Sequence, residues 1–144
     1  LLTDFYSNQV LASRDPNTRV EPASLTKLMT AYLTFKALAE KRLTLEQTLL
    51  VSPKGWKTEG SRMFLDPKVP VSVSDLIRGM IVQSGNDACV TLAEGIAGSE
   101  ENFAQMMNRV CAANDSRSEA AGDEQHQFRQ FNGAAWGKSL YDGA

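Results

Sequence analysis

The feature that most constrains the fold is an amphipathic stretch that begins at Ser24 and continues to about Ala39 or Glu40. Its large apolar side chains recur at spacings of three and four residues, as they do along one face of an α-helix. They are Leu25, Leu28, Met29, Tyr32, Phe35 and Leu38. We therefore predict a helix that packs into the core through these side chains.

The first turn of this helix carries a serine and a lysine three residues apart, Ser24 and Lys27. Residues at i and i+3 lie on one helix face, so the Lys27 amine can come within hydrogen-bond reach of the Ser24 hydroxyl. Such an amine can take the proton of a serine that attacks a carbonyl, provided that burial or neighbouring donors lower the lysine pKa. A helix N-cap followed by a solvated lysine has the same spacing. An isolated pair favours this second interpretation, so further motifs have to decide.

A second polar group, Ser84-Gly85-Asn86, lies between two apolar helical runs. Gly85 is expected to permit a backbone geometry that a Cβ would hinder, so that Ser84 and Asn86 point the same way. The alternative is structural, because Asn86 or Asp87 would also serve as the N-cap of the helix that follows. Together, S-x-x-K and S-x-N are two of the three motifs that mark serine β-lactamases and penicillin-binding proteins.

Three longer segments resemble, in order, those of the serine D-alanyl-D-alanine carboxypeptidases, which are low-molecular-mass penicillin-binding proteins of the S11 peptidase type. They are residues 22–30, 60–65 and 83–88, and the similarity covers about the first 113 residues. The resemblance implies that Ser24 is the nucleophile and Lys27 its proton acceptor. It also implies that Ser84 relays a proton and that Asn86 holds the lysine and the substrate amide.

The third motif of these proteins, Lys-Thr-Gly, occurs nowhere in the sequence. In the family, the strand that carries it forms the opposite wall of the cleft, binds the substrate carboxylate and leads to a backbone N–H of the oxyanion hole. The residues from Asn114 onward fit the family poorly, and Lys138-Ser139-Leu140 is not the triplet. We therefore expect this wall of the cleft to have no counterpart in the chain.

The resemblance implies an α+β fold, namely the helical portion of the penicillin-binding transpeptidase and β-lactamase-like fold, with the remaining sheet strands missing. Two short apolar runs around Tyr6-Ser7-Asn8 predict an N-terminal β-hairpin. We divide the chain into residues 1–113, the N-terminal part of the transpeptidase domain, and residues 114–144, an atypical segment. A hairpin without partner strands presents an exposed edge, so we expect self-association there.

Local signals predict the connections between the helices. Ser72 with Asp75 three residues on is typical of a helix N-terminus, and Gly98-Ser99 ends one helix and begins another. Met63 and Phe64 fit core packing, although the resemblance implies that their segment lies near the mouth of the cleft. We assign this segment no chemistry.

Composition narrows the function classes. The chain has 144 residues, of which 42% are hydrophobic and 22% charged, as expected for one globular core. A net charge of -2 provides no basic field, so nucleic acid is not an expected partner. One histidine, His126, and two cysteines, Cys89 and Cys111, do not make a metal cluster, so no metal or cofactor is expected. We expect two buried thiols, and spacing alone does not decide whether they pair.

No apolar run is long enough to span a bilayer, and the chain begins without the pattern of a signal peptide. We therefore expect any export signal to have been removed. The resemblance implies a periplasmic or extracytoplasmic protein at the outer side of the cytoplasmic membrane. Family members are often held there by a C-terminal amphipathic anchor, and we expect no such anchor in residues 1–144.

Two classes of function remain. The resemblance implies a carboxypeptidase that trims peptidoglycan stem peptides ending in D-Ala-D-Ala through an acyl-enzyme and that is trapped by β-lactam antibiotics. The alternative is an incomplete, non-catalytic fragment or binding remnant of such an enzyme. A β-lactamase is less favoured, because residues 60–65 and 83–88 resemble the carboxypeptidases and no glutamate stands out as an additional base.

Overall fold

The computed structural model describes residues 1–16 and 23–121, with side chains described as far as Ala113. The expectations for His126 and for Lys138-Ser139-Leu140 lie outside these residues. Within the described ranges the fold mixes helices with short strands that pair two by two, which confirms the predicted α+β class. The described strands do not form the full sheet of that class of fold.

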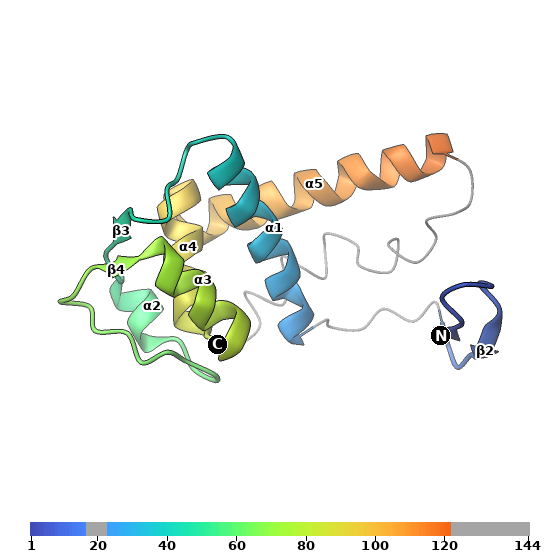
Figure 1. The fold of residues 1–144 in the computed structure, drawn as a ribbon, viewed down its shortest axis with the longest axis horizontal. Helices are drawn as coiled ribbons and strands as arrows, with labels where there is room; N and C mark the ends of the chain where they lie inside the picture. Colours follow the sequence, from blue (N-terminus) through green and yellow to red (C-terminus); the bar gives the residue numbers. More distant parts are fainter. Residues whose placement is uncertain (17–22, 122–144) are drawn as a thin grey trace.

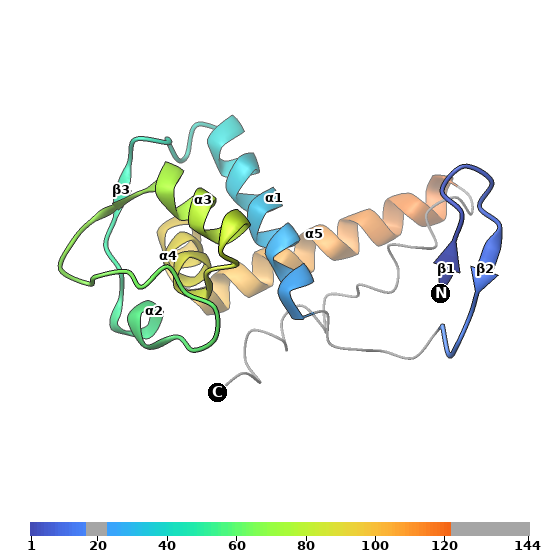
Figure 2. The same cartoon turned by 60° about the horizontal axis from the view of Figure 1, so that its bottom comes forward.

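The elements follow one another with short connections. In chain order they are β1 (Leu2–Thr3), β2 (Val10–Ala12), the 3₁₀ turn η1 (Ala23–Leu25), α1 (Thr26–Ala39), β3 (Thr48–Leu49), α2 (Pro53–Lys57), β4 (Val71–Ser72), α3 (Val73–Val82), α4 (Asn86–Ala97) and α5 (Glu100–Ala121). Figures 1 and 2 show α1, α2, α3, α4 and the start of α5 gathered in one body, from which the rest of α5 projects, with the β1–β2 hairpin apart from that body. The core is therefore helical.

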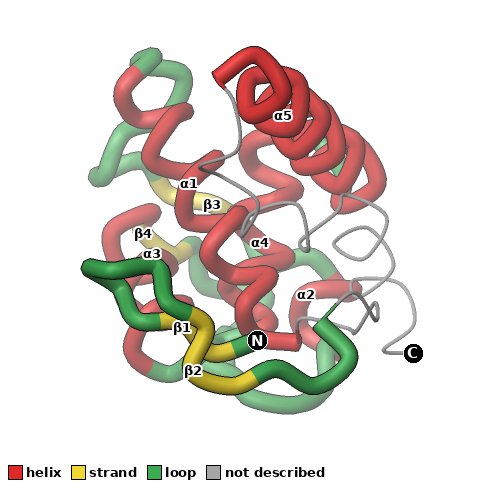
Figure 3. Tube along the Cα trace, turned by 90° about the vertical axis from the view of Figure 1, so that its right-hand side faces the viewer, coloured by secondary structure: helices red, strands yellow, loops and turns green. Residues whose placement is uncertain are grey.

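Helix α4 lies at the centre of this body, where it contacts α1, α2, α3 and α5 (Figure 3). Its residues Asp87–Ala93 are all buried, so every side of the helix faces protein. Two clusters of core residues meet on it. One includes Leu76 and Leu92, and the other includes Leu33 and Phe103. Ser84 in the turn before α4 and Asn86 at the start of α4 are therefore joined directly to a buried helix.

The predicted packing face of α1 is wrong at four of its six residues, whereas Met29 and Leu38 do pack against the core clusters. Leu25, Leu28, Tyr32 and Phe35 are 49%, 67%, 51% and 50% exposed. The residues of this helix that are buried are Thr26, Thr30, Leu33, Thr34 and Ala37. Both sides of α1 carry apolar side chains, so periodicity alone does not decide which side packs. The buried side has the smaller residues, three of them threonines, and this allows α4 to approach. The Thr34 hydroxyl is satisfied inside the helix, since it donates to the Thr30 carbonyl at 2.7 Å.

The local signals at helix ends are confirmed. The Ser72 hydroxyl accepts from the Asp75 backbone N–H at 3.1 Å and donates to the Asp75 carboxylate at 2.7 Å, which caps α3. Gly98 ends α4 with a left-handed φ of 80°, a conformation that suits glycine. The Ser99 hydroxyl then accepts from the Asn102 N–H at 3.2 Å and begins α5.

The predicted N-terminal hairpin is also confirmed, since β1 and β2 pair antiparallel. The Asp4 carboxylate accepts from the Ser7 backbone N–H at 2.8 Å and from its hydroxyl at 2.7 Å, and these bonds lower the Asp4 pKa. Phe5 and Tyr6 are 86% and 92% exposed, and both core clusters lack hairpin residues. The hairpin is therefore held by its own turn rather than by the core.

The interpretation of Met63 and Phe64 as core residues is half right. Met63 packs against the first core cluster, whereas Phe64 is 79% exposed and has a left-handed φ of 60°. The Arg62 guanidinium lies over the Phe64 ring, 5.0 Å from its centre, so the ring is covered by a cation at the surface.

Helix α5 continues to Ala121 and passes through the boundary that we predict between residues 113 and 114. The polar character after Asn114 therefore does not end the helix. The division into two parts remains a prediction. Of the helices that the structure describes, none combines the length and the apolar character needed to cross a membrane.

Candidate active site

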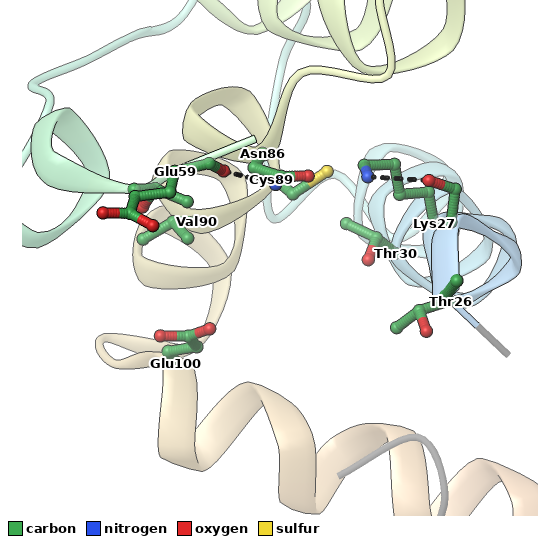
Figure 4. Close-up of a pocket in the computed structure, with 11 residues that line it drawn as sticks. Thr26, Lys27, Thr30, Glu59, Asn86, Cys89, Val90 and Glu100 are labelled. Carbon is green, nitrogen blue, oxygen red and sulfur yellow. Dashed lines mark hydrogen bonds between the residues drawn. The ribbon is translucent and has the colours of Figure 1, made fainter. Parts of the chain in front are cut away.

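Ser24 and Lys27 lie where the 3₁₀ turn η1 runs into α1. The Lys27 Nζ donates to the Ser24 Oγ at 3.5 Å, which is the long end of a hydrogen bond (Figure 4). Such bonds are often long in an enzyme without substrate and shorten when substrate binds. The three-residue spacing thus brings a hydroxyl and an amine to one face.

Ser84 reaches the pair from the end of α3. Its Oγ donates to the Ser24 Oγ at 3.3 Å. Ser84 itself has a left-handed φ of 54°, whereas Gly85 has a φ of -63°. The expectation that Gly85 supplies the unusual backbone geometry is therefore wrong. Gly85 matters for space instead, because a Cβ there would lie 3.1 Å from the Cγ of Met63.

Asn86 is the first residue of α4. The prediction that Asn86 or Asp87 caps this helix is wrong, because the N-cap is Gly85 and no side chain provides a capping hydrogen bond. The Asn86 Nδ2 instead donates to the Glu59 carbonyl at 2.7 Å (Figure 4). Since the nitrogen is used in this way, the amide oxygen is the atom left to accept from a ligand or from Lys27.

Asp87 is the residue of this region that sequence reasoning missed. It is 1% exposed, and its two carboxylate oxygens accept from the backbone N–H groups of Met63 at 2.9 Å and Leu65 at 3.2 Å. A carboxylate is buried only when it is paired or hydrogen-bonded. The signal in the sequence was an aspartate that opens the apolar run Ala88-Cys89-Val90.

Two pockets open beside the Ser24–Lys27 pair, and both are lined by these two residues. The first has a volume of about 320 Å³ and is the one drawn in Figure 4. Its other lining residues include Thr30, Glu59, Asn86, Cys89 and Glu100. The second has a volume of about 510 Å³ and is mostly apolar, with Leu28, Met80, Ile81 and Ser84 in its wall. Ser24 is thus accessible from a pocket of mixed polarity and from a mostly apolar one.

Cys89 lies in the first pocket but is no rival nucleophile. Burial raises the pKa of its thiol to about 12, although the charge of Lys27 acts in the opposite direction. At neutral pH the thiol is therefore protonated, and the thiolate is the reactive form.

Glu100 lines the same pocket and is only 6% exposed. The Lys54 Nζ lies 2.6 Å from its carboxylate and 3.0 Å from that of Glu101. These two bonds, first the one to Glu100, raise the Lys54 pKa well above its usual range. The Glu100 charge is thus compensated by an ion pair that ties α2 to the start of α5.

A serine hydroxyl that contacts an amine and a second hydroxyl can attack a carbonyl and pass its proton on. Among the described residues no group of three or more histidine, cysteine, aspartate or glutamate side chains is placed to hold a metal ion. The fold and the contacts of Ser24 are thus those expected of a site in which a serine is paired with a lysine.

The comparisons give the family within this class. The model of the D-alanyl-D-alanine carboxypeptidase family, peptidase S11, matches residues 1–114. The chain is 43% identical over 114 residues to D-alanyl-D-alanine carboxypeptidase DacC of Escherichia coli, and the match covers 75% of this chain and 28% of that relative. The chain therefore belongs to the D-alanyl-D-alanine carboxypeptidase family. It spans less than a third of the length of this curated relative.

Solved structures agree with this assignment. The crystal structure of penicillin-binding protein 5 from Haemophilus influenzae matches with a TM-score of 0.69 at 40% identity, over 77% of this chain and 33% of that chain. Penicillin-binding protein D2 from Listeria monocytogenes, in its ampicillin-bound form, matches with a TM-score of 0.62 at 27% identity, over 74% of this chain and 42% of that chain. About three quarters of this chain therefore shares the fold of these proteins.

Proposed function

We propose that this chain carries the nucleophilic half of a serine D-alanyl-D-alanine carboxypeptidase site. The observation that supports this most is that the Ser24 Oγ contacts both the Lys27 Nζ at 3.5 Å and the Ser84 Oγ at 3.3 Å. In the proposed reaction the Ser24 Oγ forms a bond with the carbonyl carbon between two terminal D-alanines of a peptidoglycan stem peptide. The C–N bond breaks, the terminal D-alanine leaves with a proton, and water then releases the shortened peptide.

Each residue has a separate role in this proposal. Lys27 accepts the proton of Ser24, and Ser84 passes it to the leaving nitrogen. Asn86 presents its amide oxygen to the substrate N–H, because its nitrogen is bound to the carbonyl of Glu59. No cofactor takes part in this chemistry.

β-Lactams are the proposed inhibitors, because a strained amide can acylate Ser24 and remain there. The Listeria monocytogenes relative, whose structure is described as ampicillin-bound, supports this class of ligand. Incubation with ampicillin followed by intact-mass measurement tests it. The expected result is one added ampicillin mass, which is lost in Ser24→Ala. An unmodified mass at high ampicillin concentration contradicts acylation.

The role of Lys27 has its own test. Lys27→Ala should abolish the adduct and leave the far-UV circular dichroism spectrum unchanged, because the side chain supplies a proton acceptor and is only half-buried. Lys36→Ala on the same helix is the matched control, since its side chain is half exposed and makes a long ion pair with Glu40 at 4.0 Å. Retained acylation in Lys27→Ala would remove this residue as the base.

A second candidate is a binding remnant that acylates slowly and does not turn over. The observation that favours it is the absence of a Lys-Thr-Gly triplet from the sequence. Loss of a single oxyanion-hole donor costs about two to three powers of ten in rate. We expect little or no release of D-alanine from a D-alanyl-D-alanine peptide by the isolated chain. Turnover equal to that of a longer family member would show that another part of the chain supplies the missing wall.

The location that we propose is extracytoplasmic, at the outer side of the cytoplasmic membrane, where the peptidoglycan substrate is. Family membership supports this proposal. Labelling of intact cells with a fluorescent β-lactam that does not cross the cytoplasmic membrane tests it. Labelling that requires lysis of the cells would contradict it.

Self-association through the β1–β2 hairpin is a further part of the proposal. Both strands have exposed apolar side chains, with Val10 and Leu11 55% and 58% exposed. Unpaired strand edges of this kind bind other strands, and a lysine on the edge prevents it. Light scattering after size exclusion should show oligomers that Val10→Lys converts to monomers. A monomeric parent chain would refute this proposal.

A further inference from the structure

The turn between α3 and α4 is held in a conformation that its own sequence disfavours. Helix α3 ends with two hydrogen bonds to one acceptor, because the N–H groups of Gln83 and Gly85 both donate to the Gly79 carbonyl at 3.1 Å. This ending requires a left-handed residue between them, a position that usually holds glycine. Ser84 occupies it with a φ of 54°. A strained residue persists only where its surroundings determine its conformation.

The surroundings that determine this turn are residues 59–65. The Asn86 backbone N–H donates to the Ser61 carbonyl at 2.7 Å, and the Asn86 side-chain nitrogen donates to the Glu59 carbonyl at 2.7 Å. In the other direction, the N–H groups of Met63 and Leu65 donate to the Asp87 carboxylate. Four hydrogen bonds therefore join the 59–65 segment to Asn86 and Asp87.

Asp87 is bonded both to the 59–65 segment and to its own helix, α4. One of its oxygens also accepts from the Ala88 N–H at 2.9 Å, so three backbone donors satisfy the buried carboxylate. It lies in the first turn of α4, where the helix dipole favours a negative charge. Hydrogen bonds to a charged group are stronger than those between neutral groups.

Packing reinforces this attachment. A Cβ on Gly79 would fall 1.7 Å from the Met63 sulfur, so the methionine occupies the space above the end of α3. A Cβ on Gly60 would lie 2.9 Å from the Asn86 Nδ2, and Gly60 has a left-handed φ of 83°. The 59–65 segment therefore packs against α3 before Ser84, through Met63, and against Asn86 after it, through Gly60.

We propose that Asp87 is a positioning residue of the site: through the 59–65 segment it holds the Ser84–Asn86 turn, and with it the Ser84 hydroxyl, at its distance from Ser24. The effect on acylation rests on the proposed function. The coupling between Asp87 and the turn does not, and it has a separate measurement.

The structural test compares Asp87→Asn with Asp75→Asn by hydrogen exchange of single amides. Asparagine keeps the size of Asp87 but turns an NH₂ group toward one of the backbone donors. We expect the amides of Met63, Leu65 and Asn86 to exchange about ten- to a hundredfold faster in Asp87→Asn. Met107 in α5 should keep its rate. In Asp75→Asn, which removes the same charge at an exposed site, the three rates should stay at the parent value.

The Asn86 amide is the decisive one, because its acceptor is Ser61 and not Asp87. If only Met63 and Leu65 exchange faster, the Ser84–Asn86 turn does not depend on Asp87, and the proposal is overturned. An equal increase at Met107 would make Asp87 a residue of general stability and overturn it as well. Gly60→Ala, which changes no charge, should also raise the Asn86 rate because the added methyl displaces its side chain.

The catalytic test uses a fluorescent penicillin and separates binding from acylation. In Asp87→Asn the maximal acylation rate constant should fall about ten- to a hundredfold, because catalytic groups moved by about 1 Å lose this much. The apparent dissociation constant should change little, and Asp75→Asn should behave like the parent chain. A change in the dissociation constant alone would refute a positioning role. If the parent chain is not labelled, the proposed function fails while the exchange measurement still decides the coupling.

Discussion

Substitutions of Ser84 can separate the effect of its backbone conformation on stability from the effect of its hydroxyl on acylation. Its left-handed backbone costs a residue with a Cβ about 1–2 kcal/mol, which glycine does not pay. Glycine lowers the free energy of unfolding by about 0.4–1 kcal/mol, because it increases the conformational entropy of the unfolded chain. The hydrogen bond to Ser24, at 3.3 Å and partly exposed, contributes about 0.5 kcal/mol. Ser84→Gly should therefore be neutral or stabilising by up to about 1 kcal/mol, whereas Ser84→Ala should lose about 0.5 kcal/mol.

Urea unfolding followed by circular dichroism measures both variants against the parent chain. The free energy of unfolding of Ser84→Gly should exceed that of Ser84→Ala by about 0.5–1.5 kcal/mol at an unchanged denaturant slope. Ampicillin labelling should be lost equally in both, because both lack the hydroxyl. A Ser84→Ala variant at least as stable as Ser84→Gly would show that the turn does not strain Ser84, and the reasoning would fail.

Three further outcomes are expected. Gly79→Ala should be strongly destabilising and should displace Met63, since the new Cβ meets its sulfur; an unchanged urea midpoint would contradict the packing. Leu92→Ala, at a fully buried position, should lower the free energy of unfolding by about 2–5 kcal/mol in the same assay. The hydrogen bonds of the hairpin turn lower the Asp4 pKa below its usual value of 3.8, so the ionised carboxylate stabilises the turn at pH values above 3.8. The turn should lose this stabilisation as the pH falls through the lowered pKa, and the NMR chemical shift of the Ser7 amide measures the change. A Ser7 shift that does not change with pH would refute this.

The elements and their ends could be predicted because their causes are local. Ser72 with Asp75 and Gly98 with Ser99 act within one turn of chain, and each is found where the sequence places it. The contact between Ser24 and Lys27 also follows from spacing along one stretch.

Features set by contacts distant in sequence could not be predicted in the same way. The packing side of α1 depends on which neighbour reaches it, and both of its sides are apolar enough to pack. The partners of Asp87 are 22 and 24 residues away in sequence, so the residues around Asp87 suggest only a capping role for it. The sequence favours Gly85 as the residue with an unusual backbone geometry, whereas the left-handed φ is found at Ser84.

The exposed side of α1 reduces the apolar surface that becomes newly exposed to water when this chain unfolds. Leu28, Tyr32 and Phe35 are already at least half in water in the folded chain, so they add little new apolar surface when the chain unfolds. Both the heat capacity change of unfolding and the denaturant slope scale with newly exposed surface. Both quantities should therefore be smaller than those of an equally long domain in which the helix corresponding to α1 is buried on all sides. The stability curve of this protein should accordingly be shallow, with a broad transition on heating.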